Sequence, residues 1–408
     1  ETAAGRSINL ALSDRGIAAL KEVGMDQYML SEAVPMLGRM IHTVGGETKL
    51  LPYSGREGEY INSVSRGGLN IALINEAHNF PESTFHFNRR CIDFDCESGE
   101  ALIENTLTGE ELSVKGDTVI ATDGAGSAIR QAMMNGGVSR FNYQQKFLEH
   151  GYKELHIPPD LVGGFQMEKN ALHIWARGEF LMIALPNFDG SFTCTLFLAF
   201  EGETSFEKLT DEASLMEFFK EHFPDSIPLM PTLAEDFFTN PTGSLGTVKC
   251  LPWNVDGKAL LIGDSAHAMV PFYGQGMNCA FEDCRVFDEL IEKHQTDWEK
   301  IFEEYTSLRK PNADAICDLA EENFYEMRDA VADPVFQRKR ELETRLEQSF
   351  PDYFSKYSMV TFREDLPYSL AQEKGNAQDK LLMRICSEIE DTQGIDLDEV
   401  MKQIRTLL

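Results

Sequence analysis

The fold is decided by one stretch of the sequence and its continuation, Leu260-Leu261-Ile262-Gly263-Asp264-Ser265-Ala266-His267-Ala268-Met269-Val270-Pro271 and Phe272-Tyr273-Gly274-Gln275-Gly276-Met277-Asn278. The apolar residues at its start predict a buried strand, and Gly263 lets the backbone come close to a bound group. Asp264, where the strand ends, can accept hydrogen bonds from sugar-like hydroxyls. Gly274 and Gly276 open a helix whose free N–H groups and positive dipole end point at whatever lies in front of them. The stretch therefore predicts a ligand where a strand meets a helix, and the alternative is an ordinary strand-turn-helix connection.

A flavin fits the order of these groups. Asp264 would hold the ribitol chain, and the helix N-terminus would face the pyrimidine edge, where its dipole stabilises the negative charge of reduced flavin. A second predicted strand runs into a tight turn with the pattern D-G-x-x-S-x-x-R, at Asp117-Thr118-Val119-Ile120-Ala121-Thr122-Asp123-Gly124-Ala125-Gly126-Ser127-Ala128-Ile129-Arg130. This second element strengthens the flavin interpretation.

Together the two elements resemble the group A flavoprotein aromatic hydroxylases, in which the D-G segment lies near flavin and pyridine nucleotide. Segments along nearly the whole chain, in the family's order, narrow the resemblance to the kynurenine 3-monooxygenase family. They are Gly5–Leu12, His150–Leu155, Leu172–Trp175, Ile183–Asn187, Ser191–Phe197 and Tyr357–Phe362. The resemblance implies the cofactors FAD and NADPH, the substrates L-kynurenine and O2, and the product 3-hydroxy-L-kynurenine, formed through a flavin C4a-hydroperoxide.

The resemblance also implies the fold class, α/β (α+β), built on an FAD-binding Rossmann-like domain of the aromatic hydroxylase type. Residues 1–140 are predicted to form the first part of that domain, and 246–296 its second part. An antiparallel sheet that serves as the substrate domain is predicted to be inserted between them, over residues 141–245. Residues 297–408 are predicted to form a helical region that contributes to the substrate pocket.

Local patterns place elements within these parts. A helix is predicted from Ser13 to Val23, with Gly24 just past its end, and another from Ser65 to Ala77. Residues 83–122 alternate like a small antiparallel meander. In the C-terminal part, an apolar stripe predicts a helix through Ile301, Phe302, Tyr305 and Leu308.

Composition excludes several classes of partner. The 408 residues are 42% hydrophobic, which supports sizeable cores, and they carry a formal net charge of −30. This charge argues against nucleic acid and against an anionic membrane surface, because both would repel the protein. The eight cysteines contain no C-x-x-C pair and indicate free thiols in a reducing cytoplasm rather than disulfides or a metal site. No uninterrupted apolar segment reaches the roughly 18 residues needed to span a membrane. In this the chain resembles the soluble, bacterial-type members of the family, so we expect a cytoplasmic protein, either monomer or homodimer.

The sequence departs from the family in containing no G-x-G-x-x-G. The nearest approaches are Gly124-Ala125-Gly126 and Gly274-Gln275-Gly276, and neither has the third glycine. Family members begin with a strand, that glycine turn and a helix, which bind the ADP half of FAD, so we expect about fifty residues of this unit to precede the present start. If the molecule lacks them, the chain is a non-catalytic flavin-site remnant that acts as a binding module.

The amino acid end of the substrate needs an anchor, and a guanidinium with a phenol suits a carboxylate. Arg39 stands between two methionines in an apolar stretch, where it would be costly to bury without an anion. Tyr53 follows across Gly45-Gly46, whose turn could return the second segment alongside the first. The resemblance makes Arg39 and Tyr53 the ligands of the substrate carboxylate, and a surface ion pair is the alternative.

Two polar residues lie further on, at an apolar helical face. Asn323 falls at helical spacing among apolar residues, and Glu326 borders the same face. Polar groups there need partners, which are either the substrate amino group or a satisfied structural network. The resemblance places substrate contacts at Asn323, Glu326 and Tyr357, with Phe272 lining the ring pocket.

For FAD, the resemblance implies contacts at eight positions, some of them through the backbone: Ala11, Arg66, Cys91, Asp123, Ala128, Asp264, Met277 and Asn278. No side chain is expected to act as a catalytic acid or base, because the flavin carries the chemistry. His267, in the tight junction beside Asp264, is expected to be structural. A hydroxylase of another aminoaryl or phenolic acid is the alternative to one of L-kynurenine.

Overall fold

The computed structural model describes residues 9–136, 138–330 and 333–407, so Gly5–Ile8 of the first family segment lie outside the described residues. The helices are α1 (Asp14–Glu22), α2 (Asp26–Ser31), α3 (Arg66–Ala77), α4 (Ala128–Asn135), α5 (Glu212–His222), α6 (Leu233–Thr239), α7 (Asp264–His267), α8 (Gly276–His294), α9 (Trp298–Tyr325), α10 (Pro334–Ser349), α11 (Lys356–Thr361), α12 (Tyr368–Ser387) and α13 (Leu397–Arg405). The strands are β1 (Leu10–Leu12), β2 (Val34–Met36), β3 (Gly38–His42), β4 (Thr48–Pro52), β5 (Ile61–Val64), β6 (Arg89–Asp95), β7 (Glu100–Asn105), β8 (Glu111–Lys115), β9 (Val119–Ala121), β10 (Asn142–Ile157), β11 (Ala171–Ala176), β12 (Leu181–Pro186), β13 (Phe192–Ala199), β14 (Gly243–Leu251), β15 (Asn254–Val255) and β16 (Ala259–Leu261).

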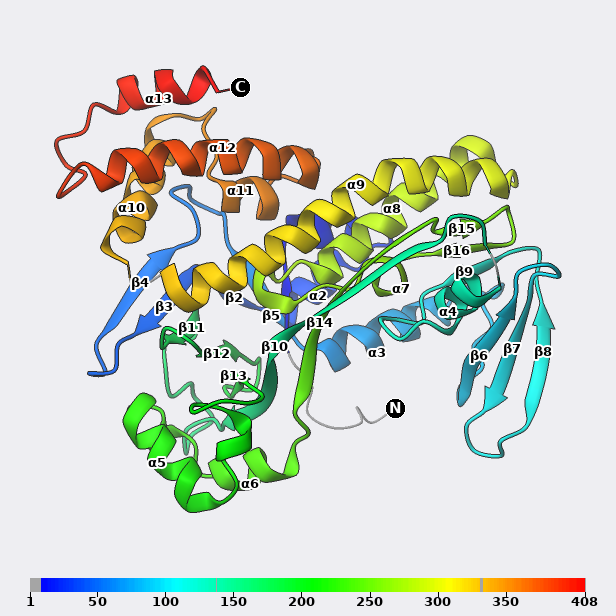
Figure 1. Cartoon of the computed structure of the whole chain (residues 1–408), viewed down its shortest axis with the longest axis horizontal. Coiled ribbons are helices and arrows are strands. Elements are labelled where there is room, and N and C mark those ends of the chain that lie inside the picture. The colour runs from blue at the N-terminus through cyan, green and yellow to red at the C-terminus, as the bar shows by residue number, and fades with distance from the viewer. Residues whose placement is uncertain (1–8, 137, 331–332, 408) are drawn as a thin grey trace.

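A seven-stranded sheet, in the order β14-β10-β13-β12-β11-β3-β4, carries the substrate side of the molecule. Its long strands β10 and β14 run side by side across the molecule toward β15 and β16 (Figure 1). The sequence predicts an antiparallel sheet within 141–245, and β10 to β13 are antiparallel neighbours there. Two strands from the 1–140 part, β3 and β4, complete the sheet. β3 pairs in parallel with β11 and so covers an edge that would otherwise be open. The predicted boundaries of the four parts stay predictions.

The two sequence stretches quoted first end up as neighbouring strands. β16, which precedes Gly263, pairs in parallel with β9, which precedes Asp123, and Leu260 lies opposite Ile120. The carboxyl ends of both strands therefore meet at one edge of the sheet, where ligands bind in open α/β folds. The predicted meander is confirmed for β6, β7 and β8, but β9 leaves it to join this parallel pair.

Two predicted helix starts are confirmed. Helix α1 begins directly after Ser13, and Gly24 beyond its end has a φ of +69°, a left-handed conformation that suits glycine. Helix α3 begins after Ser65, whose hydroxyl accepts a hydrogen bond from the Gly68 N–H at 3.2 Å. This side-chain cap satisfies one of the N–H groups that have no partner within the helix.

The predicted apolar stripe on α9 is shorter than expected. Its first members are fully buried: Ile301, Phe302 and Tyr305. Leu308 was wrongly predicted to continue the stripe, since it is 48% exposed, and Arg309 is buried beside it instead. The reason is electrostatic: Arg309 reaches the carboxylates of Glu282 and Asp283 on α8, each at 2.6 Å.

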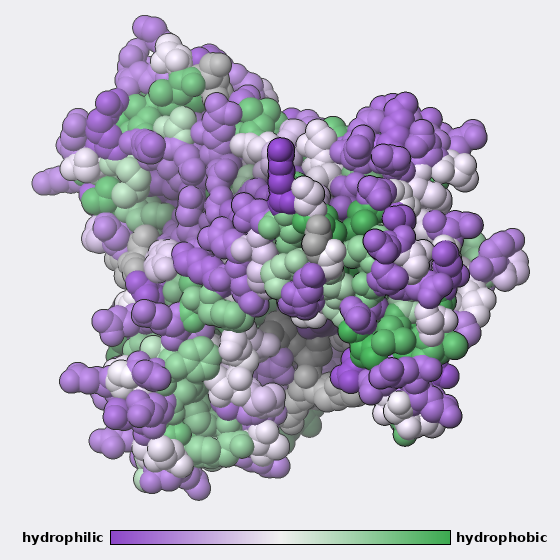
Figure 2. All heavy atoms as spheres, turned by 45° about the vertical axis from the view of Figure 1, so that its right-hand side comes forward, coloured by the Kyte–Doolittle hydropathy of each residue, from purple (hydrophilic) through white to green (hydrophobic). Residues whose placement is uncertain are grey.

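Hydrophilic residues cover most of the face seen in Figure 2, in keeping with the large negative charge. All eight cysteines are unpaired thiols. Within the part of the chain that the structure describes, no helix combines the length and the apolar character needed to cross a membrane.

Two imidazoles, His42 on β3 and His173 on β11, are linked to each other in the seven-stranded sheet. His173 Nε2 lies 2.8 Å from the Glu168 carbonyl oxygen, and its Nδ1 lies 2.8 Å from His42 Nε2. His42 Nδ1 lies 2.9 Å from Asp225 Oδ2. Because the Glu168 carbonyl can only accept, Nε2 of His173 carries the proton, and neutral His173 accepts from His42 through Nδ1. Burial lowers the pKa of His173 from 6.5 to about 4.

This lowered pKa predicts a stability change with pH. The unfolded chain takes up a proton at His173 below about pH 6.5, whereas the folded chain resists it down to about pH 4, so His173 weakens the fold as pH falls through this window. We expect the free energy of unfolding of the wild type, relative to that of His173→Gln, to fall by about 3 kcal/mol between about pH 7 and pH 4. Urea unfolding of both proteins across this range measures it, and a constant difference would contradict the assignment.

Candidate flavin and substrate site

A single cavity of about 630 Å³ collects most of the residues singled out in the sequence. This volume lies within the range of about 300–1,000 Å³ typical of small-molecule sites. The predicted residues that line it are Ala11, Arg39, Tyr53, Arg66, Asp264, Phe272, Met277 and Tyr357. They come from β1, the β3–β4 hairpin, the start of α3, the segment from the end of β16 into α8, and α11. The cavity therefore lies where the substrate sheet, the flavin elements and the C-terminal helices meet.

One end of the cavity has the groups that a flavin requires. Asp264 is exposed to the cavity and makes no hydrogen bond to another described residue, so its carboxylate is available to ligand hydroxyls. Gly263 and Gly274 have φ values of +63° and +66°. A Cβ on Gly274 would lie 2.9 Å from the Ala11 Cβ, so any side chain there would press against a wall of the cavity. Both backbone positions therefore suit glycine conformationally, and Gly274 does so sterically as well.

The start of helix α8 faces the same space, and Gly276 and Met277 line it. Asn278 is fully buried and does not line it, because its amide is used internally. That amide donates to the carbonyls of Ala11 and Gly274, both at 2.8 Å, and accepts from the Ser13 N–H at 3.0 Å. Asn278 thus ties β1 to the start of α8, whose first two residues line the cavity and whose first N–H groups have no partner within the helix. The donor set and the helix end fit the pyrimidine edge of a flavin.

Besides Asn278, three more predicted flavin contacts lie outside this cavity. Asp123 Oδ2 accepts from the N–H groups of Ala128 at 2.8 Å and Ile129 at 3.4 Å, so it stabilises the start of α4. Ala128 lines a separate polar groove beside β6, and half-buried Cys91 lies on β6 itself. A role of these residues in binding FAD stays a prediction.

The other end of the cavity holds a buried cation among aromatic rings. The guanidinium of Arg39 lies 5.0 Å from the ring centre of Tyr357 and 5.8 Å from that of Tyr53. These two rings are stacked at 5.0 Å, and Tyr273 stacks on Tyr357 at 5.5 Å. The β3–β4 hairpin creates the arrangement as the Gly45-Gly46 turn predicted, because it returns the chain so that Tyr53 follows β4 beside Arg39.

Arg39 is 7% exposed, yet it is only loosely paired. A guanidinium has five N–H donors. The nearest carboxylate oxygen, Glu326 Oε1, lies 3.6 Å from its Nη1, which is beyond ordinary hydrogen-bonding distance. The buried Tyr53 hydroxyl has no hydrogen-bonding partner of acceptable geometry among the described residues. Both groups are therefore available to a ligand.

The tyrosines beside Arg39 are hydrogen-bond donors rather than bases. Burial raises the pKa of Tyr53 and of Tyr273 well above the usual value, and Arg39 opposes this only in part. Burial likewise raises the pKa of Tyr357. All three phenols keep their protons near neutral pH, so they can donate to an anion.

Asn323 and Glu326 stand behind the cavity lining. Asn323 is buried, as its helical face predicts, and donates to the Phe272 carbonyl at 2.6 Å. It thereby fixes a residue that does line the cavity. Glu326 begins a short π-helical turn, Glu326–Ala330, and pairs loosely with Arg39. Direct substrate contacts of both residues stay predictions.

Among the lining residues that were not predicted from the sequence are Thr195, Phe197 and Tyr273. Thr195 is 1% exposed, and its hydroxyl has no hydrogen-bonding partner among the described residues. The signal for two of them was present, because alternation along β13 places Thr195 and Phe197 on one face of the sheet. His267 is structural as expected, since its Nε2 lies 2.6 Å from Asp283 Oδ2.

Comparison with known proteins identifies relatives over almost the full length. Residues 4–320 match the family described as FAD binding domain. The chain is 46% identical to the kynurenine 3-monooxygenase of Myxococcus xanthus (strain DK1622) over 405 residues, which are 99% of this chain and 86% of that protein. It is also 46% identical to the kynurenine 3-monooxygenase of Flavobacterium johnsoniae, with 99% and 90% covered. Identity to the Anopheles gambiae protein of the same name is 42%, with 94% and 79% covered.

Solved structures share the fold. Klebsiella pneumoniae HpxO, in complex with FAD and uric acid, superposes with a TM-score of 0.66 at 18% identity, over 90% of this chain and 88% of that one. The tetrameric form of 2-methyl-3-hydroxypyridine-5-carboxylic acid oxygenase has a TM-score of 0.65 at 18% identity, with 84% and 88% covered. The predicted fold class is confirmed.

Proposed function

Because the chain belongs to the kynurenine 3-monooxygenases, and to the FAD-binding-domain family that matches residues 4–320, we propose that it hydroxylates L-kynurenine to 3-hydroxy-L-kynurenine with NADPH as reductant and O2 as oxidant. It is an FAD-dependent monooxygenase. When bound, FAD supplies the transfer of oxygen to the aromatic ring, while the chain supplies binding, orientation and a dry cavity.

The observation that carries the proposed substrate is the loosely paired guanidinium of Arg39. It is buried and lines the cavity, and its only carboxylate neighbour among the described residues lies at 3.6 Å. A substrate carboxylate would take the free donors of Arg39 in a paired contact. Glu326 stands next to Arg39 with the opposite charge, so an α-amino acid group, which carries both charges, matches the pair.

Each proposed contact then has a physical role. Arg39 and the Tyr53 hydroxyl would bind the substrate carboxylate, and Glu326 its ammonium group. Phe272 and Tyr357 would flank the substrate with aromatic surface, and Asn323 would support Phe272 from behind through the hydrogen bond at 2.6 Å. The aniline ring would lie toward Phe272, at the end of the cavity nearer to α8.

The cofactor contacts proposed are those at the other end of the cavity. Asp264 would accept hydrogen bonds from the ribitol hydroxyls. Met277 and the backbone of Asn278 would face the pyrimidine edge. Arg66, exposed at the start of α3 and lining the cavity, would meet the pyrophosphate, and Ala11 would pack near the ring system.

The test is the effect of L-kynurenine on NADPH oxidation by the FAD-loaded protein. An enzyme that must not consume reductant without substrate should oxidise NADPH faster when L-kynurenine is present, and mass spectrometry should detect a product one oxygen heavier. Decarboxylated kynurenine is the matched control and should stimulate weakly, because it offers nothing to Arg39. Equal oxidation rates with and without L-kynurenine, with hydrogen peroxide as the sole product, would overturn the proposal.

A further inference from the structure

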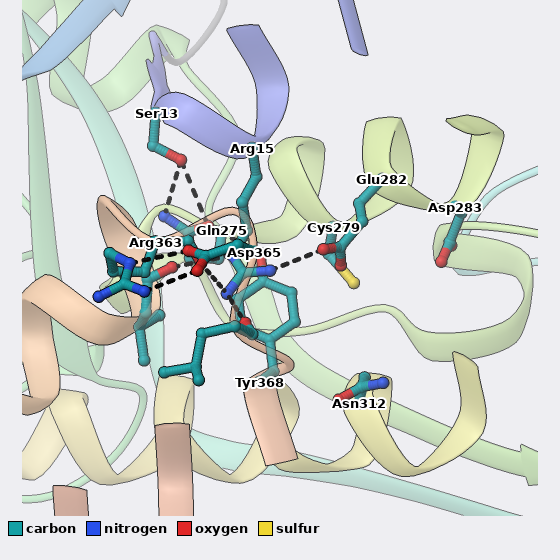
Figure 3. A network of polar contacts seen from close by, with 12 residues as sticks. Ser13, Arg15, Gln275, Cys279, Glu282, Asp283, Asn312, Arg363, Asp365 and Tyr368 are labelled. Atoms are coloured by element: carbon teal, nitrogen blue, oxygen red, sulfur yellow. Dashed lines mark hydrogen bonds and ion pairs between the residues drawn. The ribbon is translucent and has the colours of Figure 1, made fainter. Parts of the chain in front are cut away.

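Arg15 is a buried arginine that the proposed chemistry does not use. It is the second residue of α1, is 2% exposed and does not line the cavity. Figure 3 shows its side chain reaching from α1 to the segment that carries Arg363, Asp365 and Tyr368. A charge buried this deeply is costly unless every donor finds a partner, so its contacts indicate what it holds in place.

The Arg15 guanidinium binds the end of helix α11. Its Nε donates to the Val360 carbonyl at 3.0 Å, and its Nη2 donates to the Arg363 carbonyl at 2.9 Å and to the Leu366 carbonyl. Val360 lies in the last turn of α11, where carbonyl groups have no partner within the helix. A cation at this end also stabilises the helix dipole. Arg15 thus acts as the C-terminal cap of α11 from a different part of the chain.

The same guanidinium is tied to the flavin side of the cavity. Its Nη1 donates to Glu282 Oε1 on α8 at 2.6 Å. The other oxygen of Glu282 accepts from Arg309 at 2.6 Å, and Arg309 reaches Asp283 at 2.6 Å. Asp283 Oδ2 then accepts from the backbone N–H of Gly263 at 3.2 Å. A continuous chain of buried, alternating charges therefore joins the end of α11 to the residue that precedes Asp264.

Tyr368 adds a second connection between the same elements. Its ring centre lies 3.9 Å from the Arg15 guanidinium carbon. Its hydroxyl donates to Gln275 Oε1 at 2.9 Å, directly before the start of α8 (Figure 3). The edge of the Arg15 guanidinium donates hydrogen bonds, and its face lies over the Tyr368 ring. Both sets of contacts hold Arg15 between the C-terminal region and α8.

Helix α11 matters to the cavity because it carries Tyr357. The ring of Tyr357 is stacked between Tyr53 and Tyr273 and lies 5.0 Å from the Arg39 guanidinium. Val360, which Arg15 holds, is one helical turn after Tyr357. The other end of α11 is held from within the C-terminal region, since the Ser358 hydroxyl donates to Glu347 on α10 at 2.6 Å. A change at Arg15 would therefore free the end of α11 that faces the flavin side.

We propose that Arg15 is a positioning residue for substrate binding. It fixes the C-terminal end of α11 and so holds Tyr357 over Arg39, in a fixed position relative to α8. This inference rests on the proposed function, because the substrate is taken to be the ligand of Arg39. Arg15 touches neither substrate nor cofactor in this arrangement. Its effect on binding passes through the backbone of α11.

The test variant is Arg15→Lys, which keeps the charge toward Glu282 but cannot reproduce the fork that reaches three carbonyls. We expect the dissociation constant of L-kynurenine, and its KM, to rise by about tenfold or more, while kcat and the FAD dissociation constant change by less than about twofold. Amide hydrogen exchange should accelerate in residues 356–366 and stay unchanged over α8.

The matched control is Arg177→Lys. Arg177 also donates to three carbonyls, those of His42, Ala176 and His222, but it does not line the cavity. Its replacement should lower Tm without changing the KM for L-kynurenine. If Arg15→Lys lowers Tm to a similar degree and leaves KM and the exchange of residues 356–366 unchanged, Arg15 is only a structural ion pair and the inference is wrong.

Should Arg15→Lys fail to fold, Glu282→Gln provides the milder change. It keeps the shape and an acceptor for Arg15 but removes the charge, so exchange in residues 356–366 and the KM should rise in the same direction by a smaller factor. Unchanged values of both would contradict the inference. Failure of the wild type to bind L-kynurenine would instead reject the proposed function, and the exchange measurement distinguishes the two because it needs no substrate.

Discussion

Arg39→Ala is expected to raise the dissociation constant of L-kynurenine by about 100-fold or more, about 3 kcal/mol, with little change in FAD affinity. Truncating one member of a buried, charge-assisted pair costs about 2–5 kcal/mol, since the other charge is left without a partner. In the described part of the chain, the side-chain contacts of Arg39 are with Tyr53, Glu326 and Tyr357 and not with the proposed flavin residues, so the flavin contacts should survive. Isothermal titration of the FAD-loaded protein with L-kynurenine measures the loss.

Two further substitutions and one further ligand test whether Arg39 binds the carboxylate of L-kynurenine. Arg39→Lys should also be damaging, because an ammonium keeps the charge but not the planar fork. Tyr53→Phe should cost less, about 0.5–1.5 kcal/mol, or up to about 3 if its hydroxyl donates to a carboxylate. Decarboxylated kynurenine should bind weakly to the wild type and be nearly indifferent to Arg39→Ala. An equal loss of affinity for both ligands would show that Arg39 does not bind the carboxylate.

Asp264→Ala is expected to weaken FAD binding by about 1.5–3 kcal/mol, a factor of about 10 to 150 in the dissociation constant. The Asp264 carboxylate has no described partner, so its removal leaves the cofactor without an acceptor and leaves no protein group uncompensated. Flavin fluorescence titration of the apoprotein measures the change. Asp264→Asn keeps an oxygen acceptor without the charge and should fall between the wild type and the alanine variant.

A control away from the cavity separates this effect from general destabilisation. Asp352 is an acidic residue whose side chain is 55% exposed and pairs with Arg405. Asp352→Ala should leave FAD affinity unchanged. Unaltered flavin affinity in Asp264→Ala as well would reject the proposed ribitol contact.

The parts of the site that could be predicted from sequence are those set by short-range rules. The glycine turn between Arg39 and Tyr53 implies a hairpin, and a hairpin places their side chains close together. The strand before Gly263 and the helix after Gly274 follow from apolar runs and glycine positions within a few residues. These local patterns do not depend on the rest of the chain, so they could be predicted from the sequence alone.

Buried charges could not be predicted in this way. The apolar stripe on α9 was predicted to include Leu308, whereas the structure exposes Leu308 and buries Arg309, because periodicity alone treats arginine as polar. Arg15 likewise has no sequence signal, because its partners Glu282 and Val360 are distant in the chain. The partners of a buried charge are settled by tertiary contacts, which a single sequence does not display.

The side-chain amide of Asn278 shows the same limit of prediction from sequence for a single residue. Its position in the sequence suggested a contact at the flavin edge, but its side chain is spent on Ala11, Gly274 and Ser13. Only the backbone of Asn278 would then be available to a cofactor. Spacing can locate a residue near a ligand, but it does not tell whether the side chain or the main chain faces it.

The parallel pairing of β3 with β11 affects the point during folding at which the protein becomes able to bind kynurenine. Gly38 pairs with Ala171, more than a hundred residues later in the chain. Closing so long a loop is slow, because its entropy is lost before the new contacts compensate. The junction of Gly263 with α8 joins neighbours in sequence and can form early, whereas the strand that bears Arg39 reaches its place only after distant segments have met. Kynurenine binding should therefore appear only after β3 has joined β11, and its recovery during refolding would report that this long-range pairing has formed.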